Sequence, residues 1–209
     1  MRIKINLKIF IFLLIFILTR QIKIYAFLML FAFIHELGHL LAGLLMGFKP
    51  KSLEVAPYGF SISFEGYSKG MAKEKTWALK RIFIAFAGPL TNLLIILAIY
   101  LYLFIVKDIN AYYVELIIYS NILIFIFNML PIYPLDGGRI IKEIINIIYG
   151  TEKSYTYTYK ISKGCVIILT IVASLGVLIY KNIAIPIIII YLWFVLIKER
   201  KYIKVLYNN

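Results

Sequence analysis

Hydrophobic residues in this chain gather in long runs, and the polar stretches between the runs are rich in lysine and arginine. A helix needs about 20 apolar residues to cross the hydrocarbon core of a bilayer. On this basis we expect six transmembrane helices, at about residues 5–19, 22–47, 78–106, 111–129, 162–180 and 183–198. Strand-like alternation is too scarce for a membrane barrel, so the pattern predicts an all-α membrane protein.

In one of the polar connections, apolar and polar residues alternate along the sequence. Between the second and third predicted helices, Leu53 and Val55 precede a Pro-Tyr-Gly turn, and Ile62 and Phe64 follow it, within residues 52–66. Such a pattern is typical of a β-hairpin, and we expect its apolar face to lie against or in the membrane on the cytoplasmic side. Two roles stay open: the hairpin edge could hold an extended peptide by strand addition, or the hairpin only covers helix ends.

The basic residues are distributed asymmetrically, which gives the chain an orientation. With the N-terminus inside, the inner segments carry 19 of the 23 lysines and arginines, and the outer segments carry 4. Inner loops of membrane proteins are enriched in these residues, so we expect both termini and the long loops 48–77 and 130–161 to be cytoplasmic. Residues 1–18 resemble a signal peptide, but no small-residue cleavage site follows, which favours an uncleaved first span.

Composition narrows the class of protein further. The chain is 63% hydrophobic with a mean hydropathy of +0.91, which excludes a soluble domain of 209 residues. A net charge of +13 would suit nucleic-acid binding, but the charges lie in loops beside the bilayer, and we expect no nucleic-acid partner. We expect a single polytopic domain over residues 1–209, with its functional core at about 22–161.

The two histidines of the chain both lie in the second apolar run. His35 and His39 are four residues apart, so a helix presents them on one face. Two histidines at this spacing can share a zinc ion, and Glu36 beside them can act as a general base. A charged residue at the centre of a span costs about 2.5–3.5 kcal/mol, so a chance motif is a poor explanation. The run predicts a zinc hydrolase site within the membrane.

Zinc then needs a third protein ligand, and no other histidine exists. The residues of suitable type in or beside the spans are Glu115, Asp136, Glu143 and Cys165. Asp136 is the strongest of them, since two prolines precede it and two glycines follow, and irregular backbone at membrane depth survives only when buried or lining a cavity. The alternative is an ordinary exit turn with a solvated Asp136. Glu115 is discounted because it lies near the outer end of its span, away from the inner half where we place the histidine motif.

Small residues follow the histidines on nearly the same face. Gly43 and Gly47 lie one and two turns beyond His39, and small residues let another helix approach closely. We expect these glycines, with Gly38, to form the face that lets Asp136 come close.

The paired motifs resemble those of the site-2 protease family of intramembrane zinc metalloproteases. The resemblance rests on His-Glu-Leu-Gly-His from residue 35 and on Asn-Met-Leu-Pro-Ile-Tyr-Pro-Leu-Asp-Gly-Gly from residue 128. It implies that His35, His39 and Asp136 bind zinc and that Glu36 is the catalytic base.

Two asparagines are further candidates for a role in the site. Ala-Gly-Pro-Leu-Thr-Asn, which ends at Asn92, resembles a further family signature. Asn92 could be a polar support of the site or make only an interhelical hydrogen bond. Asn128 is a candidate catalytic residue that could donate to the oxyanion or hold the substrate backbone. The alternative for Asn128 is to cap the broken end of the fourth helix.

Within the family, the Pro-Tyr-Gly loop, the six expected spans and the lack of a PDZ insert look like the sporulation-type branch. That resemblance implies cleavage of the membrane-associated pro-sequence of a sigma factor, and membrane-embedded inhibitor partners. Members usually carry a C-terminal nucleotide-binding CBS domain, which we do not find in these residues.

The sequence thus predicts a zinc-dependent endopeptidase that cleaves a membrane-associated or single-span substrate in the inner half of the bilayer. A multi-span transporter would spread its buried ionisable residues over several spans, whereas here they converge on two motifs. A catalytically inactive scaffold would be expected to lose a ligand or the base, yet all four residues are present.

Overall fold

The computed structural model describes residues 22–56, 59–65, 75–106, 111–180 and 184–207, with scattered positions before residue 22. Most of these residues are helical, as the sequence predicts. The chain divides into two compact units. The first holds Met1–Ala72 and Phe83–Asn128, and the second holds Lys73–Ile82 and Met129–Asn209.

Three long apolar helices dominate the first unit: α2 (Ile22–Leu45), α3 (Lys75–Ile105) after its first turns, and α4 (Ala111–Met129). Their bounds agree with the second, third and fourth predicted spans to within a few residues. The helices carry no acidic residue in their first turns and no basic residue in their last. Apolar burial therefore holds them in place more than capping charges do.

The predicted hairpin is confirmed, and it belongs to a larger sheet. Strands β2 (Pro50–Ala56) and β3 (Gly59–Phe64) pair antiparallel, with Leu53 opposite Ile62. A strand not predicted from the sequence, β1 (Arg2–Ile5), pairs parallel with β2, so the strand order is β1-β2-β3. The Pro-Tyr part of the turn lies outside the described residues.

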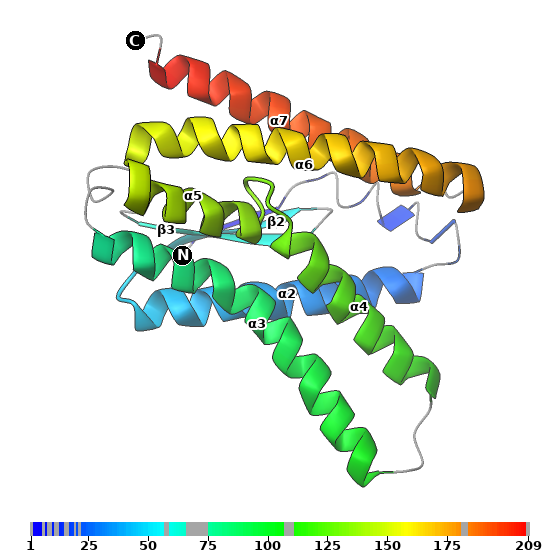
Figure 1. Cartoon of the computed structure of the whole chain (residues 1–209). Coiled ribbons are helices and arrows are strands. Elements are labelled where there is room, and N and C mark those ends of the chain that lie inside the picture. Colours follow the sequence, from blue (N-terminus) through cyan, green and yellow to red (C-terminus); the bar gives the residue numbers. More distant parts are fainter. Residues whose placement is uncertain are drawn as a thin grey trace. The chain divides into compact units, whose positions relative to one another are not determined.

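The apolar face of the hairpin packs on α2, where we had expected the membrane (Figure 1). The ring of Phe64 lies so close to Gly43 that a side chain at residue 43 would overlap it. The Phe33 and Phe60 rings meet edge to face with their centroids 5.1 Å apart. The hairpin buries its apolar residues against protein because a glycine in α2 leaves room for a phenylalanine.

The second unit contains a helix where the sequence predicted a loop. Residues 130–161 include α5 (Asp136–Tyr149) and the start of α6 (Thr151–Tyr180), so the loop expectation was wrong there. Helix α5 carries polar residues on one side and isoleucines on the other, which makes it amphipathic and too polar to be found by a search for spans. Gly150, at a positive φ of 81°, separates the two helices, and α6 packs along α5 and α7 (Ala184–Tyr207) (Figure 1).

Four of the described helices are long and apolar enough to cross a membrane: α2, α3, α4 and the Thr151–Leu175 part of α6. The sixth predicted span falls in α7, which is helical. The first, residues 5–19, lies largely outside the described residues. The count of six spans, the single domain over 1–209 and the core at 22–161 stay predictions.

The second unit contains a cluster of buried charged side chains. Arg81 Nε lies 3.5 Å from Glu143 Oε1, and both side chains are nearly buried. Lys142 Nζ lies 3.7 Å from the centroid of the Tyr155 ring and 4.4 Å from that of Tyr133. Burial raises the pKa of Glu143. Desolvation lowers the pKa of Lys142 to about 8, and the opposing attraction of nearby carboxylates, Glu199 first, does not restore it.

The lowered pKa of Lys142 predicts a pH-dependent stability. Between about pH 8 and 10.5 the unfolded chain holds the Lys142 proton and the folded chain does not, so this residue makes the free energy of unfolding rise with pH. Below pH 8 its buried charge weakens the fold. We expect Lys142→Met to be more stable than the parent at pH 7, by roughly 1–3 kcal/mol, with the difference shrinking towards pH 10.5.

Reversible unfolding of the full chain in mixed detergent, followed by circular dichroism across this pH range, measures the effect. Lys198→Met is the matched control because Lys198 is exposed on α7. A Lys142→Met difference that stays constant with pH would contradict the assignment.

Candidate metal centre

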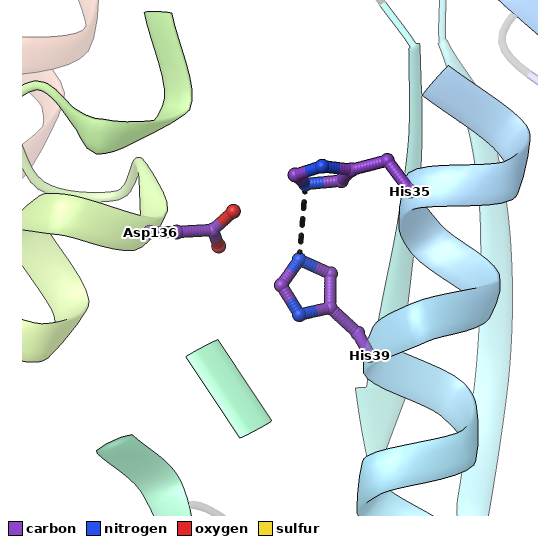
Figure 2. Close-up of side chains that lie close together, drawn as sticks. All are labelled: His35, His39 and Asp136. Atoms are coloured by element: carbon purple, nitrogen blue, oxygen red, sulfur yellow. Dashed lines mark hydrogen bonds between the residues drawn. The ribbon is translucent and has the colours of Figure 1, made fainter. Parts of the chain in front are cut away.

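Helix α2 presents His35 and His39 on one face, and both side chains are buried. Their imidazole rings stand nearly perpendicular, with centroids 4.8 Å apart. The two Nε2 atoms lie 3.1 Å from each other (Figure 2). The four-residue spacing therefore brings together the two nitrogens that the sequence predicted would share a metal.

The opposite nitrogen of each ring is held by a group on another part of the fold. His39 Nδ1 lies 2.7 Å from the backbone carbonyl oxygen of Ile84 on α3. A carbonyl oxygen can only accept, so His39 donates its Nδ1–H there. His35 Nδ1 lies 2.5 Å from Asn92 Oδ1, and with the amide oxygen as acceptor it also donates. Both hydrogens are then on Nδ1, and both Nε2 atoms carry lone pairs.

Two lone pairs at this distance repel unless a cation lies between them. Zinc binds imidazole nitrogen at about 2.0–2.1 Å in tetrahedral geometry, which places two nitrogen ligands about 3.3 Å apart. The observed 3.1 Å between the Nε2 atoms is close to that value. The donor set of this histidine pair therefore fits a zinc ion.

Gly88 on α3 leaves the space that the histidine pair needs. A Cβ atom at residue 88 would collide with His39 Nε2 and would lie 2.6 Å from His35 Nε2. Gly38 faces α3 in the same way, since a Cβ atom there would overlap Thr91 and lie 2.9 Å from the Ala87 carbonyl oxygen.

We had expected the glycines of α2 to make room for Asp136, and this was wrong. Gly38 makes room for α3, and Gly43 makes room for the Phe64 ring. Gly47 follows the end of α2 at a positive φ of 85°, a conformation that favours glycine.

Glu36 is also buried, and its carboxylate accepts a hydrogen bond from the backbone N–H of Ile62 on β3. Ile62 pairs with Leu53 of β2, and its N–H is turned to α2 instead of to β2. The predicted base therefore lies at the outer edge of β3. A peptide that pairs with a strand edge would pass directly beside this carboxylate.

Asp136, in the second unit, is the first residue of α5 and is buried. A carboxylate is favoured at a helix N-terminus by the exposed N–H groups and the helix dipole. The loop before Asp136 folds tightly over the helix start. Cβ atoms at Gly137 and Gly138 would each lie 2.6 Å from a carbonyl oxygen of that loop, and Tyr133 N–H donates to Ser162 Oγ of α6 at 3.0 Å.

The remaining candidates have other surroundings. Asn128 donates its Nδ2–H to the Ile124 carbonyl of its own helix at 3.0 Å, and its catalytic role stays a prediction. Glu115 is exposed. Glu143 pairs with Arg81, and Cys165 is half-buried in α6.

Two groups that support this centre, directly or through Asn92, were not predicted from the sequence. The Ile84 carbonyl belongs to the backbone and has no signal in the sequence. Asn121 on α4 accepts a hydrogen bond from Asn92 Nδ2 at 2.9 Å, and both asparagines are fully buried. A lone asparagine inside an apolar run was a usable signal for Asn121, because polar residues in spans usually serve a function.

A family model described as Peptidase M50B-like matches residues 8–135, more than half of the chain. The chain belongs to the Peptidase M50B-like family. A model described as Peptidase family M50 matches residues 107–172. The resemblance to site-2 proteases is thereby confirmed.

Three relatives extend this result. The chain is 28% identical over 146 residues to stage IV sporulation protein FB of Bacillus subtilis (70% of this chain, 48% of the relative). It is 29% identical over 159 residues to putative zinc metalloprotease sll0528 of Synechocystis sp. (72% and 39%). It is 28% identical over 184 residues to zinc metalloprotease MJ0392 of Methanocaldococcus jannaschii (86% and 50%). The sporulation protein supports the expected branch, and the chain spans half or less of the length of each relative.

A solved structure, the site-2 protease from Methanocaldococcus jannaschii, superposes with a TM-score of 0.70. The match covers 94% of this chain and 89% of the other at 23% identity. The two chains share the fold.

The close contacts at Gly88 allow us to predict the effect of adding one methyl group there. Gly88→Ala should displace both Nε2 atoms and lower the zinc affinity of the purified chain at least tenfold, measured by competition with a chelator. Alanine favours a helix over glycine, so the loss is not expected to come from unfolding of α3. Gly164→Ala is the control, since a Cβ there meets nothing within 4 Å. Unchanged zinc affinity in Gly88→Ala would contradict the proposed position of the metal.

Proposed function

We propose that this protein is a zinc-dependent endopeptidase that hydrolyses a peptide bond of a membrane-associated or single-span substrate in the inner half of the bilayer. The observation that carries the proposal is the buried pair of Nε2 lone pairs on α2, a helix long and apolar enough to span a membrane. The neighbouring Glu36 supplies a base at the same place. Neither a transporter nor an inactive scaffold is favoured by these features.

The proposed metal ligands are His35, His39 and Asp136. His35 and His39 lie together on α2, Asp136 begins α5, and each of the three side chains is buried (Figure 2), which supports the proposal. Three protein ligands leave a fourth position open, as in catalytic zinc sites, and a carboxylate is a common third ligand. Two relatives are named zinc metalloproteases, which supports zinc as the cofactor.

Bound zinc supplies a Lewis acid that polarises the substrate carbonyl and makes water more acidic. Glu36 takes the proton of the attacking water and returns it to the leaving amine. The Ile62 N–H holds the Glu36 carboxylate in place for this transfer. Asn128 is the proposed donor to the oxyanion, provided that its amide leaves the Ile124 carbonyl.

The edge of β3 supports a binding mode for the substrate. A helical peptide keeps its carbonyl groups in internal hydrogen bonds, so it must unwind before hydrolysis. We propose that the unwound segment pairs with the outer edge of β3 next to Glu36. The sporulation-type resemblance extends this proposal to the pro-sequence of a sigma factor as substrate and to membrane-embedded inhibitor partners. The asymmetric distribution of lysine and arginine supports cytoplasmic termini.

The base is tested by Glu36→Gln, which keeps the size of the side chain and removes its basicity. Co-expression with candidate single-span or pro-sequence substrates should give cleavage at least about a hundredfold slower than in the parent, seen by immunoblot of the product. Glu115→Gln, at an exposed position, should cleave normally. Cleavage at the parental rate in Glu36→Gln would rule out the protease mechanism.

The third ligand is tested separately by metal content. Asp136→Ala should lower the zinc bound by the purified full chain at least tenfold, as measured by mass spectrometry after dialysis against a weak chelator. Glu152→Gln, an exposed carboxylate in the first turn of α6, should keep full zinc. Full retention in Asp136→Ala would remove Asp136 from the ligand set.

A further inference from the structure

A chain of hydrogen bonds runs from the metal centre through two further helices of the first unit. His35 Nδ1 on α2 contacts Asn92 Oδ1 on α3 at 2.5 Å. Asn92 Nδ2 donates to Asn121 Oδ1 on α4 at 2.9 Å, and Asn121 Nδ2 donates to the Ile117 carbonyl at 2.8 Å. Both asparagines have no exposed surface, so no water competes for these groups.

The Ile117 carbonyl, at the far end of this series of hydrogen bonds, determines which group of each residue donates and which accepts. The Ile117 carbonyl can only accept, so Asn121 must turn its NH₂ group towards it and its oxygen towards Asn92. Asn92 must then present its NH₂ group to Asn121 and its oxygen to His35. An amide oxygen accepts a hydrogen bond, so His35 must carry its hydrogen on Nδ1. A backbone carbonyl of α4 thus determines, through two amides, which nitrogen of His35 carries the lone pair.

The order of donors and acceptors matters because His35 has a second possible tautomer, with its hydrogen on Nε2. His39 is fixed by the Ile84 carbonyl, which leaves a lone pair on His39 Nε2. If Asn92 turned over, its NH₂ group would face His35 Nδ1, and His35 would carry its hydrogen on Nε2. That hydrogen would then point at His39 Nε2, 3.1 Å away. The two ligand nitrogens would bond to each other, and the metal would have to break that bond.

We propose that Asn121 is a positioning residue of the metal centre: it keeps Asn92 in the orientation that places the hydrogen of His35 on Nδ1 and its lone pair on Nε2, the atom proposed to bind a metal. The proposal rests on the proposed function in one respect, since it takes His35 Nε2 as a metal ligand. Asn121 does not touch metal or substrate, and it acts only through Asn92. The alternative is that the two amides merely tie α3 to α4.

The first test measures the hydrogen position on His35 without using activity. The chain contains two histidines, so ¹⁵N-histidine labelling gives two imidazole spin systems, and His39 is an internal control. In the full chain in bilayers, stripped of metal, both rings should carry hydrogen on Nδ1. In Asn121→Leu the His35 Nδ1 signal should shift to that of a bare nitrogen, while His39 stays unchanged. An unchanged His35 signal overturns the proposal.

The second test is a double-mutant cycle on zinc affinity. Asn121→Leu should weaken zinc binding by 10- to 100-fold, the range for lost outer-shell partners. Asn92→Asp supplies a side chain that accepts in either orientation, so it no longer needs Asn121. In the Asn92→Asp background, Asn121→Leu should therefore change zinc affinity less than twofold. An equal loss in both backgrounds would show a packing role and overturn the proposal.

Ser120→Ala is the matched control, because Ser120 is a buried neighbour on α4, and it should leave zinc affinity and both histidine signals unchanged. Asn121→Asp, protonated in its apolar surroundings, can accept from Asn92 and donate to Ile117, and it should restore the parental His35 signal. A missing protease activity in the parent would refute the proposed function while the histidine signals still report on Asn121. The two failures are therefore distinguishable.

Discussion

The centre of this protein depends on one constraint: a histidine that binds a metal through Nε2 must give the hydrogen on Nδ1 to an acceptor. Water is scarce within a membrane, so the fold itself must supply that acceptor. For His39 it is the Ile84 carbonyl, and for His35 it is the Asn92 oxygen. Both acceptors come from α3, so the packing of α2 on α3 orients both histidines.

Close packing of these helices requires residues without side chains. Gly38 lets α3 approach α2, and Gly88 leaves open the volume into which both Nε2 atoms point. The hairpin packs on α2 in a similar way. The Phe64 ring lies against Gly43, and the Ile62 N–H donates a hydrogen bond to Glu36. Small residues thus serve the chemistry by letting polar backbone groups come within hydrogen-bond distance of ionisable side chains.

The second unit meets a different requirement, which is to hold a buried carboxylate at the start of a helix. Gly137 and Gly138 allow the proline-containing loop to fold onto α5, and Ser162 fixes that loop through the Tyr133 N–H. Two buried charges of this unit have partners: Glu143 pairs with Arg81, and Lys142 lies over two aromatic rings. Burying a charge is costly unless it finds partners, and for Lys142 these contacts offset only part of that cost.

The sequence alone determined the features that leave a periodic pattern or a biased composition along the chain. Helical spacing placed His35 and His39 on one face, apolar runs marked the long helices, and alternation marked the hairpin. Only the tertiary structure decided which acceptors hold the two Nδ1 atoms, because the Ile84 carbonyl is backbone common to every residue and Asn121 is a single polar residue 29 positions from Asn92. It also decided that the hairpin packs on α2 and that α5 is a helix, since burial against a neighbour depends on distant parts of the chain and leaves no local pattern.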